Sequence, residues 1–182
     1  MGLTYKSMRT MLADRVRSGD LALWEPQFPG DSHKRTLFIT AEVNDGFDEE
    51  TWHDASLAYR YGQLAGDFDR YVTGDTIPVG FDPYDKSDNA FMARIDPAEY
   101  GIWDIRSMAP RPAIRVFGAF AEIDVFVALT TRLRRDLGSR ASREWASARE
   151  DAIARWNNLF PGYPRLSGER IDDFISEKTL AV

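Results

Sequence analysis

Arginine is the residue type in this chain best placed for chemistry. Arg106 and Arg115 lie in successive segments that alternate apolar and polar residues, and a third such segment leads into Arg132, Arg134 and Arg135. The planar guanidinium group holds phosphate through paired hydrogen bonds better than a lysine ammonium does. If these segments are neighbouring strands, the sheet gathers basic groups at one end. Such a surface binds an anion, a phosphate or an RNA strand.

The alternating pattern predicts an antiparallel meander of three strands joined by short turns. We expect these strands over residues 102–106, 113–120 and 125–130, with a tight hairpin at 121–124. Two further strands are predicted, a longer one at 35–43 and a short one at 91–95.

Helical spacing of apolar residues predicts three helical regions. They cover residues 5–17, 48–71 and 142–159, and Gly62 and Gly66 leave open a split of the second into two helices. Residues 73–89 have the composition of a loop, and residues 171–175 form either a last strand or a helical turn.

We expect the helices to pack on one face of an antiparallel sheet, which makes an α+β fold. A chain of 182 residues suits one such domain. We expect a helical extension and loop over 1–34, a core over 35–160 and a C-terminal tail over 161–182. The stripe of Trp145, Ala148, Ala152, Trp156 and Leu159 is interpreted as part of that core.

Composition excludes several classes of protein. The chain has no cysteine, so disulfides and thiolate chemistry are ruled out. No apolar run is long enough to cross a membrane, and the N-terminal residues lack the apolar centre of a secretory signal, so we expect a cytoplasmic protein. The sequence also lacks the glycine-rich phosphate loop and the sequence signatures of serine hydrolases and zinc proteases.

Charge is distributed unevenly along the chain. The net charge is −6, and the first 90 residues carry −7 while the remaining residues carry +1. An acidic chain is a poor general binder of nucleic acid. The second half, where almost all basic residues are arginine, is the part that can still form a local basic face.

The stretch from Gly101 to Arg135 resembles the RelE/ParE superfamily, including its HigB-like members. The residues that carry the resemblance are Gly101-Ile102-Trp103-Asp104-Ile105-Arg106, then Ile114-Arg115-Val116-Phe117, then the apolar strand 126–130 ahead of Arg132-Leu133-Arg134-Arg135. By order of elements the likeness extends over residues 35–160. The chain departs from the family in being acidic and longer, and in having arginines where the family has paired lysines and a threonine.

The resemblance implies a bacterial toxin-like protein that acts on RNA or the ribosome, is held by a small antitoxin protein and needs no metal or other cofactor. In an RNA endonuclease of this kind, Arg106, Arg115 and Arg134 would be catalytic. Arg111, Arg132 and Arg135 would bind RNA.

Two other functions stay open. The same fold could serve as a non-catalytic interaction module, with Arg106 and Arg115 paired to Asp104 or Glu122 as structural ion pairs. An enzyme acting on a small molecule, with a pocket against the aromatic-rich sheet, is the third class. The two histidines, His33 and His53, are interpreted as surface or capping residues rather than as a general base.

Overall fold

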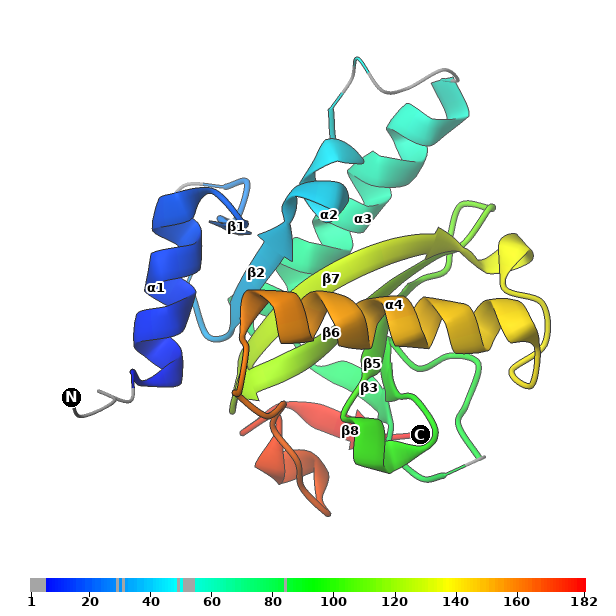
Figure 1. The fold of residues 1–182 in the computed structure, drawn as a ribbon. Coiled ribbons are helices and arrows are strands. Elements are labelled where there is room, and N and C mark those ends of the chain that lie inside the picture. The colour runs from blue at the N-terminus through cyan, green and yellow to red at the C-terminus, as the bar shows by residue number, and fades with distance from the viewer. Residues whose placement is uncertain (1–5, 29, 31, 49, 51–54, 84) are drawn as a thin grey trace.

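The computed structural model describes residues 6–28, 30, 32–48, 50, 55–83 and 85–182. Within these residues, eight strands form one twisted sheet in the order β1-β2-β7-β6-β5-β4-β3-β8 (Figure 1). The strands are β1 (Leu21–Leu23), β2 (Thr36–Thr40), β3 (Ile77–Gly80), β4 (Met92–Arg94), β5 (Trp103–Ser107), β6 (Ile114–Glu122), β7 (Val125–Leu133) and β8 (Thr179–Ala181). The predicted α+β class is confirmed.

The predicted meander is the centre of this sheet. Strands β4, β5, β6 and β7 pair antiparallel in sequence order, and the β6–β7 pair is the longest. Gly118 lies where the β6–β7 register shifts, and a Cβ atom there would come 2.2 Å from the carbonyl oxygen of Val127. Glycine is therefore needed at this irregularity.

The sheet is mixed, and here the prediction of an antiparallel sheet was incomplete. β2 pairs with β7, β3 with β4, and β3 with β8, in each case parallel. β3 lies inside the segment 73–89 that was predicted to be a loop, and β1 and β8 were not predicted. These three strands have three or four residues each, too few for an alternating pattern to show.

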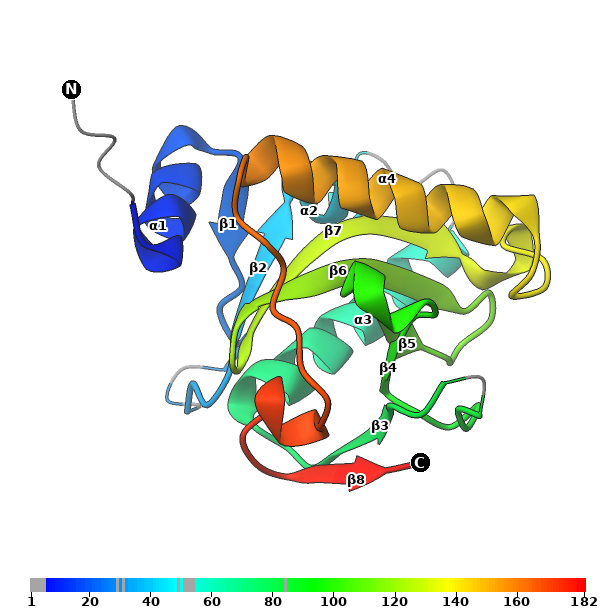
Figure 2. The same cartoon turned by 60° about the horizontal axis from the view of Figure 1, so that its bottom comes forward.

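Helices cover both faces of the sheet, so the expectation that they pack on one face was wrong (Figures 1 and 2). α3 (Ala55–Thr73) and the short α2 (Ala41–Asp45) lie on one face, α4 (Arg143–Leu159) lies across the other, and α1 (Met8–Ser18) packs beside β1. α3 continues through Gly62 and Gly66 as one helix. The predicted strand 35–43 was too long, because the side chain of Thr40 caps α2 and ends β2 there.

Two apolar layers therefore form the core. In the layer under α3, the rings of Trp103, Phe120 and Phe174 pack edge-on or tilted against one another, and Phe68 packs edge-on against Trp24. The layer under α4 contains Trp145, Ala148, Ala152 and Trp156, as predicted from their spacing. Residues 171–175 were expected to form either a strand or a helical turn. The structure shows a short 3-10 turn there, η4 (Ile171–Asp173).

Candidate anion-binding site

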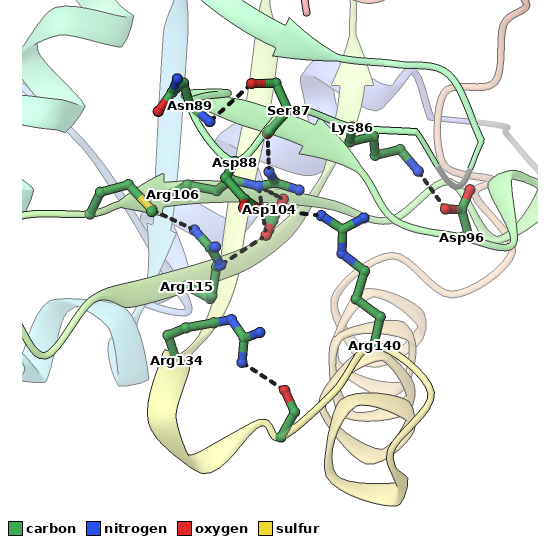
Figure 3. A network of polar contacts seen from close by, with 12 residues as sticks. Lys86, Ser87, Asp88, Asn89, Asp96, Asp104, Arg106, Arg115, Arg134 and Arg140 are labelled. Atoms are coloured by element: carbon green, nitrogen blue, oxygen red, sulfur yellow. Dashed lines mark hydrogen bonds and ion pairs between the residues drawn. The ribbon is translucent and has the colours of Figure 1, made fainter.

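A buried network of three charged side chains lies on the α4 side of the sheet. Asp104 and Arg106 are two residues apart on β5 and so share one face, and Arg115 on β6 lies directly opposite Arg106. Nε of Arg106 is 3.0 Å from Oδ1 of Asp104, and Nε of Arg115 is 3.4 Å from Oδ2 of the same carboxylate (Figure 3). One carboxylate thus faces two guanidinium groups, which leaves the network with a net positive charge.

The remaining contacts of these arginines do not neutralise that charge. Nη1 of Arg106 donates to the carbonyl oxygen of Ser87 at 3.0 Å, and Nη1 of Arg115 lies 3.3 Å from the sulfur of Met108. Burial lowers the pKa of Arg115 to about 10, although Asp104 raises it in part. Arg115 therefore remains protonated at neutral pH.

A pocket of about 310 Å³ opens beside this network. Its wall has two chemically different parts. One part carries four cations and a single carboxylate: Lys86, Arg94, Arg106, Arg140 and Asp96. The other part is apolar: Ile95, Pro97, Ala141 and Trp145.

Lys86 and Arg140, two of the cations in this wall, differ in how firmly their partners hold them. Lys86 is almost fully buried, and its ammonium nitrogen lies 2.5 Å from Oδ2 of Asp96. Burial lowers the pKa of Lys86, and the hydrogen bond that its ammonium group donates to Asp96 opposes that shift. Arg140 is exposed and reaches only to 4.0 Å from the carboxylate of Asp88, so it can swing onto a ligand (Figure 3).

Arg94 contributes to the same wall from β4. Its guanidinium carbon lies 3.7 Å from the ring centroid of Phe81, and Nη1 donates to the carbonyl oxygen of Gly168. Burial lowers the pKa of Arg94. The aromatic ring and the carbonyl fix this cation without neutralising it.

Three of the predicted site residues come together here. Arg106 lines the pocket, Arg115 lies behind it in the network, and Arg134 points toward the same region from η3 (Arg134–Asp136) (Figure 3). Arg134 donates to the carbonyl oxygen of Gly138 at 2.7 Å and lies over the ring of Trp145. It therefore supports the apolar wall and the loop that carries Arg140.

The other three predicted residues lie elsewhere. Arg132 contacts Glu42 at 3.1 Å and Asp151 at 2.7 Å, Arg135 is exposed beside Asp136, and Arg111 is exposed in the loop between β5 and β6. The ion pairs that were expected as an alternative between these arginines and Asp104 are present, since Arg106 and Arg115 both contact that carboxylate. Glu122 pairs instead with Arg9.

Sequence reasoning missed Lys86, Arg94 and Arg140 as members of one site. Lys86 stands in the predicted loop, and Arg140 lies just before Ser142, the residue that caps α4. The sequence did indicate that Asp104 lies near Arg106, because the two residues share a face of one predicted strand. His33 is exposed and lies 3.1 Å from Glu25, and His53 falls outside the described residues.

Within the part of the chain that the structure describes, no helix is both long enough and apolar enough to cross a membrane. Among those same residues, no group of three or more histidine, aspartate or glutamate side chains is arranged to hold a metal ion.

Searches against protein-family models, curated proteins and solved structures each return no match for this chain. The resemblance to the RelE/ParE superfamily therefore stays a prediction, and the function has to be argued from the pocket.

Proposed function

We propose that this protein binds RNA through phosphate groups at the cationic pocket and acts on it as a toxin-like protein of the RelE/HigB type. The observation that carries the proposal is the imbalance of charge in the pocket wall, four cations against one carboxylate. A site that is short of negative charge and partly shielded from water favours an anionic ligand. Arginines predominate in it, which suits phosphate.

The pocket also supplies groups for cleavage of the RNA backbone. Guanidinium groups of Arg106 and Arg140 would stabilise the negative charge that develops on phosphorus-bound oxygens. Lys86 is the candidate for proton transfer, because it lies in the pocket wall and burial lowers the pKa of its ammonium group, although its hydrogen bond to Asp96 opposes that shift. The sequence alone suggested no such group.

The first experiment measures binding of a fluorescently labelled single-stranded RNA by anisotropy over a range of salt concentrations. Arg140→Ala removes a pocket cation that has no buried partner, and Arg135→Ala removes an exposed cation outside the pocket as the matched control. We expect Arg140→Ala to weaken binding about tenfold and to reduce the salt slope by about one. An equal loss in both variants would reject the pocket as the binding site.

A second measurement tests the toxin-like action. Induced expression in a bacterial host should arrest growth and degrade RNA, and Arg140→Ala should relieve both effects while Arg135→Ala should not. Normal growth and intact RNA, combined with binding in vitro, would favour the non-catalytic interaction module on the same fold. The buried Asp104–Arg106–Arg115 network is the observation that favours that second function, since it also serves stability.

A further inference from the structure

The pocket is too small for a length of RNA chain. Its volume of about 310 Å³ is at the lower end of the range for ligand pockets, which is about 300 to 1,000 Å³. A pocket of this size holds one small molecule or one nucleotide unit. An RNA strand would therefore engage it with an end rather than with its middle.

The two parts of the wall match the two parts of a nucleotide. The cations come from the segment around Lys86, from β4 and β5, and from the loop before α4. The apolar part combines Ile95 and Pro97 with Trp145, whose indole is held by Arg134 on one side and by an edge contact to Phe117. A base can stack or pack on such a surface while its phosphate reaches the cations.

Charge further favours a terminal phosphate over an internal one. A phosphodiester within the chain carries one negative charge, whereas a phosphomonoester at an end carries about 1.5 to 2 at neutral pH. The wall carries Lys86, Arg94, Arg106 and Arg140, and Arg115 lies behind them. Three carboxylates contact these five cations, namely Asp96, Asp104 and Asp88, which leaves a surplus of two positive charges. The surplus of positive charge exceeds what one diester can neutralise.

From these observations we propose that the pocket recognises a terminal nucleotide of RNA that bears a phosphomonoester, with the phosphate on Arg106, Arg140 and Lys86 and the base on Trp145. This proposal rests on the proposed function and specifies its ligand. Under this proposal, the protein recognises the ends of RNA molecules.

The test uses the intact protein and one RNA sequence in three forms, with a 5′-phosphate, with a 3′-phosphate, or with hydroxyl groups at both ends. Each form carries the same internal label, and binding is followed by anisotropy. We expect one phosphorylated form to bind at least tenfold more tightly than the hydroxyl form, and which form does so identifies the end that is read. In Arg140→Ala this advantage should disappear, whereas Arg135→Ala should keep it.

A competition experiment separates this inference from the proposed function. A nucleoside monophosphate should displace the phosphorylated RNA, and the corresponding nucleoside should not. Equal binding of all three RNAs, with loss in Arg140→Ala, would overturn end recognition and leave RNA binding intact. If the mononucleotide binds but no RNA form does, the RNA function is overturned, and so is end recognition as we state it. If neither binds, both proposals are wrong.

Discussion

Two regions of this molecule hold buried arginines whose surroundings differ in kind. On the α3 side, Arg60 is completely buried and donates to the carbonyl oxygens of Ser107, Ala109 and Pro112. On the α4 side, Arg106 and Arg115 share one carboxylate and lie at or behind a pocket.

Burial lowers the pKa of Arg60 and of Arg115 alike, so the direction of the shift does not distinguish the two regions. What distinguishes the two regions is the set of hydrogen-bond partners that each guanidinium group has. Among the described residues, the guanidinium group of Arg60 donates to main-chain oxygens at the end of β5 and in the loop that follows it, which makes it a cross-link between α3 and that segment. Arg115 instead has Nε without a hydrogen bond, and its network lies beside a pocket. A guanidinium group that is short of partners next to a cavity is a better candidate for ligand binding than one that is fully engaged.

The largest effect on stability should follow from removing the cross-link. Arg60→Met keeps the bulk of the side chain but leaves three carbonyl oxygens without their donors. We expect the free energy of unfolding, measured in urea, to fall by about 3 kcal/mol or more. The RNA affinity of the molecules that remain folded should be unchanged. A large loss of affinity without a loss of stability would reverse the roles assigned to the two regions.

Removing the shared carboxylate should give the next largest effect, and one that an anion can offset. Asp104→Asn leaves two buried guanidinium groups without a counter-charge, which should cost about 3 kcal/mol. Inorganic phosphate should then raise the melting temperature of Asp104→Asn more than that of the wild-type protein, because the anion supplies the missing charge.

The control for this rescue is Arg60→Met, which lies on the other side of the sheet. Phosphate should stabilise it no more than it stabilises the wild-type protein. Equal stabilisation of all three proteins would mean that phosphate acts on the whole surface and that the network has no special affinity for anions.

How far the sequence predicts this molecule depends on the length of the pattern involved. The strand ends of the meander were predicted to within three residues and α4 to within one, because alternation and helical spacing persist there over many residues. Strands β1, β3 and β8 are short, and their pairing depends on segments far away in the chain. No local pattern carries that information.

The candidate site was predicted in part for the same reason. Arg106 and Arg115 stand on adjacent predicted strands, so their proximity follows from the register. Lys86, Arg94 and Arg140 join them only because the 86–97 segment and the loop before α4 meet over β5. Arg132 differs from Arg134 by two positions, yet Glu42 and Asp151 hold it away from the pocket. Those contacts depend on the tertiary structure.

The smallest expected effect concerns Asp67, which accepts a hydrogen bond from Ser107 in the region around Arg60. Burial raises the pKa of Asp67 above its ordinary value of 3.8, although Ser107 and Arg60 oppose that shift. The folded state therefore holds a proton that the unfolded state has already lost. As the pH rises above 3.8 toward the pKa in the folded state, the wild-type protein should lose stability relative to Asp67→Asn, which cannot ionise.

Urea unfolding of both proteins between pH 4 and pH 7 measures this difference, with Asp172→Asn as a control at an exposed carboxylate that contacts Arg170. The stability of Asp67→Asn minus that of the wild-type protein should increase with pH, and the corresponding difference for Asp172→Asn should change less. A difference that falls with pH would mean that Asp67 is stabilised as an anion, with Arg60 as its counter-charge. Arg60 would then have an acidic partner as Arg106 does, and the contrast between the two regions would rest on the pocket alone.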